Sequence, residues 1–352
     1  MRAFAAAFLV VGLLAAPAGG QDRDLELVGA FLAGPDITGA VLSGENLYVT
    51  TLGTLSIYDV SDPLNPRRQS IAPAQLLVHG ELLATNDRVL LLNDYSGTLD
   101  VWDVEDKTNP VPAGRVLGVG DEHFSCVLDC LWVYGSNGTI VDLRDPEAPV
   151  KTDLNWKALT GTKGRVHRLD ESRPGILVTA PRGSSPTVID ARDPLAPVVI
   201  ARTRFSAVNQ AMFLYSEWPQ QTRHRYLFAS IEATGSSCEN GDNGALLSFD
   251  TAGWPDRARF RPADRYRVPG GSGETCQAYY PSFHPDFRDN GLIALPASVE
   301  GVRVVEVGRD GSLHEVDAFK PPVSEVWLAF WADSEILYLL NATGEVYILS
   351  YS

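Results

Sequence analysis

A repeated stretch constrains the fold of this chain more than any other feature. "GTLSIYDVSDPLNP" begins at Gly53, and related stretches begin at Gly97, Gly138 and Pro186. In each copy a short apolar run ends in an aspartate, a second aspartate follows three residues later, and a proline closes the stretch. The strand-ending aspartates follow one another at intervals of 44, 39 and 48 residues (Asp59, Asp103, Asp142 and Asp190).

Weaker copies continue the series to the C-terminus. They end at Asp250, at Glu306 and in the final "GEVYILSYS", which makes seven copies in all. A period of about 40–50 residues with several short strands per unit is typical of β-propeller blades. We therefore expect an all-β fold, a seven-bladed β-propeller that occupies residues 19–352 as a single domain.

One unit illustrates the expected blade. Four apolar runs separated by turn residues predict four strands, which we name A to D from the channel outward (Ala74–Thr85, Arg88–Asp94, Thr98–Val104 and Val111–Gly118). The last unit supplies only three strands, whereas "LELVGAF" near the N-terminus reads as a D strand without its own blade. We expect Leu25–Phe31 to pair beside Tyr347–Tyr351, which closes the ring and covers two sheet edges.

The repeat resembles a known family. "LSIYDVSDPLNP", "LDVWDVEDKTNP", "TIVDLRDPEAP" and "TVIDARDPLAP", together with "SGENLYVT", are similar to the LVIVD repeat of bacterial extracytoplasmic β-propellers. The likeness covers Leu25 to Arg204 and fades towards Ser352, where the loops lengthen. The resemblance implies the fold, but propellers host many unrelated activities, so it implies no particular function.

The N-terminus has the anatomy of a secretory signal peptide. Arg2 is followed by an apolar run from Ala3 to Ala15 and an A-x-A site at residues 16–18. The alternative, an uncleaved anchor, fits less well because the run is short and stops at Pro17. We expect residues 1–18 to be removed and the protein to be secreted or periplasmic, without lipid attachment because no cysteine follows the run.

The net charge and the absence of known catalytic motifs argue against several classes of binding partner and enzyme. The formal net charge is −15, and removal of Arg2 with the signal peptide makes it −16. Nucleic acids and anionic membrane surfaces are disfavoured partners, since both are bound through clustered cations. No internal run is long enough to span a membrane, so we do not expect an integral membrane protein. The chain also lacks the common nucleophile, zinc-protease, P-loop and dinucleotide motifs, which favours a non-enzyme.

The paired aspartates are interpreted as structural. Each pair marks the end of strand C and the turn that follows, and short carboxylates there accept hydrogen bonds from turn N–H groups. Four copies spread around a ring cannot form one active site, so we expect turn caps (Asp59 with Asp62, Asp103 with Asp106, Asp142 with Asp145, Asp190 with Asp193).

The starts of the A strands supply the candidate site. His79, His123 and His167 precede the aspartate of their unit by 24, 19 and 23 residues, so they occupy similar positions near the channel. The D–A and B–C loops share this rim, and corresponding positions in later blades are polar (Asn209, Gln277, Tyr279 and Glu325). We expect a binding module that holds a small ligand or an envelope protein here. The alternatives are a metal-dependent enzyme with a transition metal on the three histidines, a cell-envelope scaffold, or histidines merely solvated in the channel.

Four cysteines in an exported chain favour disulfides, with three possible connectivities. We favour Cys126–Cys130 across a tight hairpin, and Cys238–Cys276, which would pin a long loop beside the rim. The loop from Glu239 to Asn243 offers oxygen ligands for Ca²⁺ but lacks the EF-hand frame, so a plain loop is favoured.

A basic segment lies in the fifth unit. Arg257, Arg259 and Arg261 alternate, which places them on one face of an outer D strand. Because charged outer strands resist pairing with other edges, we interpret them as edge protection in preference to an anion site.

Overall fold

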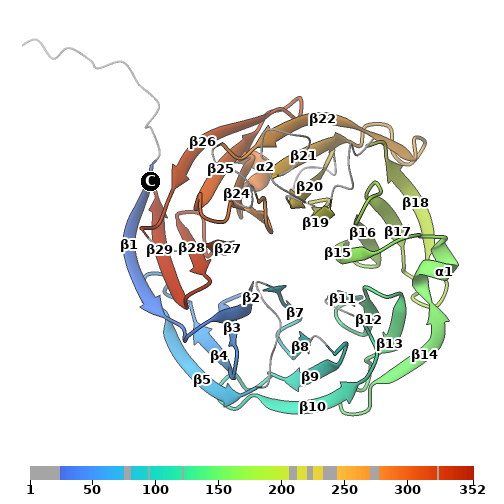
Figure 1. Ribbon diagram of the computed structural model, residues 1–352, viewed down its shortest axis with the longest axis horizontal. Coiled ribbons are helices and arrows are strands. Elements are labelled where there is room, and N and C mark those ends of the chain that lie inside the picture. The colour runs from blue at the N-terminus through green and yellow to red at the C-terminus, as the bar shows by residue number, and fades with distance from the viewer. Residues whose placement is uncertain are drawn as a thin grey trace, which may run out of the picture.

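The computed structural model describes residues 24–74, 81–93, 96–120, 123–205, 212–219, 225–232, 244–269, 277–322 and 325–352. The signal-peptide segment 1–18 lies outside these residues. The described strands form largely antiparallel sheets arranged in a ring around a central axis, with their innermost strands facing that axis (Figure 1). This is the architecture of an all-β propeller, as the repeat period predicts.

The first half of the ring contains three sheets, whose strands follow chain order from the axis outward. The first is built from β2 (Ile37–Ser43), β3 (Asn46–Thr51), β4 (Thr54–Asp59) and β5 (Arg67–Pro73), and β6 (Glu81–Leu82) adds to β2 in parallel. The second contains β7 (Ala84–Thr85), β8 (Val89–Asn93), β9 (Leu99–Asp103) and β10 (Val111–Val116). The third contains β11 (Phe124–Val127), β12 (Trp132–Gly135), β13 (Thr139–Asp142) and β14 (Val150–Asn155).

The second half follows the same plan. One large sheet joins β15 (Val166–Arg173), β16 (Ile176–Pro181), β17 (Thr187–Asp190) and β18 (Val198–Thr203) to β19 (Met212–Glu217), β20 (Tyr226–Glu232), β21 (Ala245–Asp250) and β22 (Arg259–Arg267). The next contains β23 (Ser282–Phe283), β24 (Leu292–Pro296), β25 (Val302–Val307) and β26 (Leu313–Phe319). The last contains β27 (Val326–Trp331), β28 (Ile336–Asn341), β29 (Glu345–Tyr351) and the N-terminal β1 (Leu25–Leu32). Two short helices interrupt the described strands, α1 (Trp156–Thr160) and α2 (Phe287–Asn290).

The N-terminal strand pairs with the C-terminal one. β1 runs antiparallel to β29, from Leu25 opposite Tyr351 to Leu32 opposite Glu345. The first and the last described strands therefore lie side by side in one sheet (Figure 1). No helix in the described part of the chain is long and apolar enough to cross a membrane.

The hydrophobic core lies between neighbouring sheets. The middle strands are buried on both faces, as in β28, where every residue is buried. Each apolar cluster contains residues of at least two successive repeats, for example Tyr48 and Ile57 with Leu90 and Trp102. Burial on both faces requires near-continuous apolar runs, which is why these strands read as Val-, Leu- and Ile-rich segments in the sequence.

The turns that leave the third strands confirm the predicted role of the paired aspartates. Asp59 accepts a hydrogen bond from the Ser61 N–H at 2.9 Å, and Asp62 accepts one from Leu64 at 3.2 Å. The same two bonds recur at the other three copies. These bonds favour the ionised carboxylate, and hydrogen bonds from Ser61 hold the pKa of Asp59 below its ordinary value.

Tyrosines on second strands tie neighbouring sheets together. The hydroxyl of Tyr134 donates to the carbonyl of Pro194 at 2.7 Å, and Tyr338 donates to Pro63 at 2.7 Å. Tyr226 donates to Arg309 at 2.8 Å in the same way. Each bond joins a buried ring to the turn after the third strand of the next blade. These turns therefore also help to fix the position of each blade relative to its neighbour.

Candidate functional site

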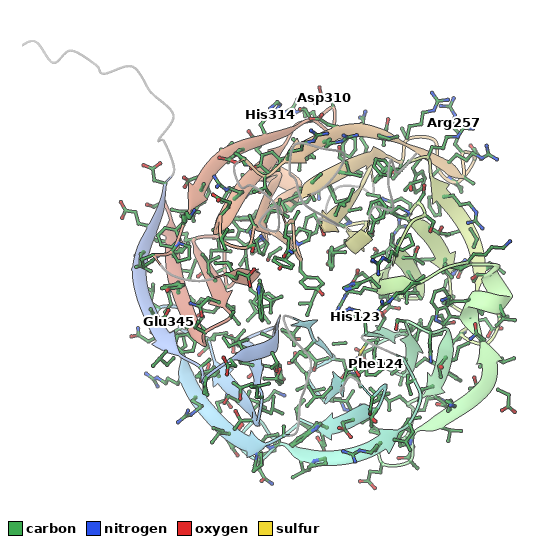
Figure 2. All side chains as sticks on the ribbon, viewed as in Figure 1. His123, Phe124, Arg257, Asp310, His314 and Glu345 are labelled. Carbon is green, nitrogen blue, oxygen red and sulfur yellow. A yellow bond between two sulfur atoms is a disulfide. The ribbon has the colours of Figure 1, made fainter. Side chains whose placement is uncertain are left out.

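The inner strands bring two of the predicted histidines together. His123 directly precedes β11, His167 is the second residue of β15, and their Nε2 atoms lie 2.8 Å apart. His123 is 4% exposed and lies at the inner edge of the ring (Figure 2). At this separation one Nε2 donates and the other accepts, so the contact requires at least one neutral imidazole. His79, the third predicted histidine, lies outside the described residues.

Backbone hydrogen bonds around β15 define the rim at which His167 lies. At the start of β15 the N–H of Arg182 bonds to the carbonyl of Arg165, so the loop before β15 meets the loop after β16. At the other end of the sheet, Ala191 bonds to Gly175, which joins the turn after β17 to the β15–β16 loop. His167 therefore belongs to the rim formed by D–A and B–C connections.

The other predicted rim residues are engaged elsewhere or not described. The Glu325 carboxylate accepts hydrogen bonds from Ser298 at 2.9 Å and from the Trp327 indole at 3.3 Å, which fixes the start of β27. Tyr279 packs against the core between the first and last sheets, and Gln277 has a buried Oε1 without a hydrogen-bond partner. Asn209 lies outside the described residues. The structure therefore brings His123 and His167 together, whereas the Glu325 carboxylate is bonded to Ser298 and Trp327.

A buried ionic network beside the histidines was not predicted. Arg168 donates through Nε to Asp170 at 2.5 Å and through Nη1 to the carbonyl of Leu82 at 2.5 Å. Its guanidinium also lies 5.9 Å from the centroid of the Tyr280 ring. The side chains of Arg168 and Asp170 are only 7% and 9% exposed. Arg168 on β15 thus contacts Leu82 in the first sheet and Tyr280, which lies just before β23.

A second acidic group continues this network. Tyr215 on β19 donates its hydroxyl to Glu217, and its ring meets that of Tyr280 edge-on at 6.1 Å between centroids. Burial raises the pKa of Glu217 to about 7, although the hydrogen bond from Tyr215 opposes this. Burial likewise raises the pKa of Asp170, against the lowering effect of Arg168. The protein therefore holds a carboxyl that titrates near neutrality beside its axis.

The sequence carries a signal for this network. "VHRLDES" in β15 places charged residues at alternate positions of an innermost strand, where Val166 and Leu169 are fully or almost fully buried. Charges at period two on a buried strand must face partners, because an unpaired buried charge is strongly unfavourable. Arg168 and Asp170 could have been selected on that ground alone, but not their partners Leu82 and Tyr280.

The predicted metal and disulfide sites are resolved only in part. Cys126 and Cys130 form a disulfide across the β11–β12 turn, with Cα atoms 4.3 Å apart, as predicted. Cys238, Cys276 and the Glu239–Asn243 loop lie outside the described residues. Within the described ranges, no group of three or more His, Cys, Asp or Glu side chains is placed to hold a metal ion.

Comparisons with known proteins identify the fold alone. No family model matches the chain, and no curated protein matches it by sequence. Among solved structures, the β-propeller domain of Myceliophteria thermophila Cps50 (Swd1) superposes with a TM-score of 0.65 at 14% identity, over 93% of this chain and 100% of that one. U3-55K gives 0.62 at 13% identity over 93% and 98%, and the RRP9 WD40 repeats give 0.63 at 13% over 94% and 98%. These similarities establish the all-β propeller fold.

Proposed function

We propose that this protein is an exported binding module that holds a small ligand or a partner protein at the rim formed by its D–A and B–C loops. The observation that carries the proposal is the buried network of Arg168, Asp170 and Tyr280 directly beside the two histidines at that rim. Arg168 ties β15, the strand that carries His167, to Leu82 of the first sheet. Polar groups such as His123 and His167 beside strands that are cross-linked in this way suit recognition of a docked ligand.

The same proposal includes a seven-bladed ring closed by the N-terminal strand. It is supported by the β1–β29 pairing and by seven apolar clusters among the described residues, each of which contains residues of successive repeats. Membership of the LVIVD-repeat family and export through residues 1–18 belong to the proposal as well. The charged, acidic composition suits a soluble exported protein.

Site-specific photocrosslinking tests the proposed rim. A photoreactive amino acid at His167 samples the mouth, and the same amino acid at Leu195 samples the turn on the opposite rim. We expect a discrete adduct from the His167 position in intact producing cells, absent from the Leu195 position and competed by added unlabelled protein. Equal labelling from both positions, or labelling from Leu195 alone, would refute binding at the mouth.

A metal-dependent activity is the second candidate, and the His123–His167 contact favours it. Two imidazole nitrogens 2.8 Å apart need to separate only slightly to share one ion, since zinc–nitrogen bonds measure about 2.0–2.1 Å. Elemental analysis of protein purified without a histidine tag tests this. We expect stoichiometric metal in the wild type and loss in His123→Ala if the idea holds, and substoichiometric metal in both, unchanged on reconstitution, if it does not.

A further inference from the structure

Arginines gather on the outer surface where two sheets of the ring join. Arg259 and Arg261 lie on β22 with the buried Phe260 between them, so both project from the exposed face. Arg204 follows β18, and Arg257 lies in the loop before β22. Figure 2 shows Arg257 on the outer circumference, far from His123 at the axis. This surface is therefore separate from the rim.

Edge protection does not account for these arginines, contrary to the expectation from the sequence. β22 pairs in parallel with β18, with Arg259 opposite Arg202 and Phe260 opposite Thr203. The N–H of Arg204 bonds to the carbonyl of Phe260 at 2.7 Å, which extends the ladder. The positive charges thus lie on a strand that has accepted a partner edge, because backbone pairing between the two sheets outweighs the repulsion of their side chains.

The pairing juxtaposes like charges. Neighbouring strands lie about 4.8 Å apart and alternate residues about 6.6 Å apart, so the backbone positions that carry these arginines are closely spaced. Like charges directly opposite one another on a sheet are destabilising. Among the described residues, none of the four arginines Arg204, Arg257, Arg259 and Arg261 forms an ion pair, although the chain carries 44 acidic residues.

The same side chains line a hollow of about 740 Å³. Its wall also contains Asp250. The Oδ1 atom of Asp250 lies 4.0 Å from Nε of Arg225, a residue that does not line the hollow. Asp256 is exposed next to Arg257. Four arginines against these two carboxylates leave an excess of two positive charges in a protein with a net charge of −15. A concave surface of opposite sign to the molecule attracts anions selectively.

We propose that this arginine groove binds an extended acidic peptide segment of a partner protein. A guanidinium is planar and donates two parallel hydrogen bonds to a carboxylate, which makes Arg the preferred partner of that group. Acidic residues at alternate positions of an extended peptide repeat at about 6.6 Å, the spacing of Arg259 and Arg261 along β22. Recognition runs through side chains where β22 pairs with β18, because Arg259 and Phe260 there already face partner residues on β18, and Arg204 continues the ladder.

Fluorescence polarisation with labelled short peptides tests the proposal. The probe peptide alternates Glu and Ser, and its isomer carries the same residues as a Glu block followed by a Ser block. At about 20 mM salt, where screening is weak, we expect the alternating peptide to bind at least about threefold more tightly than the block isomer. Equal affinities would overturn the match in spacing, and preferential binding of heparin or polyphosphate would assign the groove to another polyanion.

Matched variants localise the binding. Arg259→Ser with Arg261→Ser removes two charges from the groove, whereas Arg265→Ser with Arg267→Ser removes two from the same strand beyond it. We expect the groove variant to lose about tenfold in affinity, since one exposed ion pair contributes up to about fivefold, and the control variant to stay within about twofold. Equal losses of affinity in both variants would show that binding depends only on the net charge of the protein, and would overturn the proposal. Thermal melts by circular dichroism verify that both variants are folded.

Discussion

Removing the buried arginine from the inner strands should destabilise the protein strongly. In Arg168→Met, Asp170 loses its ionic partner and Leu82 loses a hydrogen bond. The second oxygen of Asp170 already lacks a hydrogen-bond partner, so the variant leaves a buried carboxylate with little compensation. Breaking a buried pair on one side costs about 3–5 kcal/mol, and we expect about 4 kcal/mol at neutral pH.

Removing both charges should restore most of the loss. In Arg168→Met with Asp170→Leu neither charge of the pair remains, and the carbonyl of Leu82 lacks its former donor, at a cost of about 1–2 kcal/mol. Burial raises the pKa of Asp170, and loss of Arg168 raises it further. In the single variant Arg168→Met, Asp170 therefore binds its proton more tightly in the folded protein than in the unfolded chain. The stability that this single variant loses should shrink as the pH falls from about 7 to about 5.

Urea denaturation of the wild type, both single variants and the double variant measures these free energies. Far-UV circular dichroism and tryptophan fluorescence must give coincident transitions for the comparison to hold. A loss below about 1 kcal/mol in Arg168→Met, against the about 3–5 kcal/mol of a broken buried pair, would refute the reasoning. The reasoning would also be refuted if the loss of unfolding free energy in the double variant equalled the sum of the losses in the two single variants, because the two side chains would then act independently.

Three further perturbations test other parts of the structure. Because the pKa of Glu217 is about 7 in the folded protein and 4.5 ordinarily, the wild type should lose stability as the pH rises between these values, and Glu217→Gln should remove up to about 3 kcal/mol of that loss; identical pH profiles of the unfolding free energy would contradict this. Replacing Cys126 and Cys130 by Ser should lower the unfolding free energy by about 2 kcal/mol, since the bridge closes a very short loop; an unchanged urea midpoint under oxidising conditions would count against it. Deleting Leu25–Phe31 should expose the edge of β29 and cause aggregation visible in light scattering, whereas a soluble, equally stable protein would show that β1 does not protect that edge.

Much of the fold was predictable because its determinants are local. The aspartate turns follow from a carboxylate two residues before the N–H that it binds, as Asp59 and Ser61 illustrate. The Cys126–Cys130 bridge follows from a short hairpin, and the meeting of His123 and His167 follows from their equivalent places in successive repeats. In each case the partners are fixed either by sequence spacing or by the repeat period.

Only the tertiary structure decided which distant groups meet. Arg168 contacts Leu82, 86 residues away, because the ring brings inner strands of non-neighbouring sheets to one axis. Likewise, the alternation of Arg259 and Arg261 is visible in the sequence, but the pairing of β22 with β18 that converts a charged edge into a groove is not. Strand periodicity determines which face a side chain occupies, whereas the curvature and closure of the ring determine what that face meets.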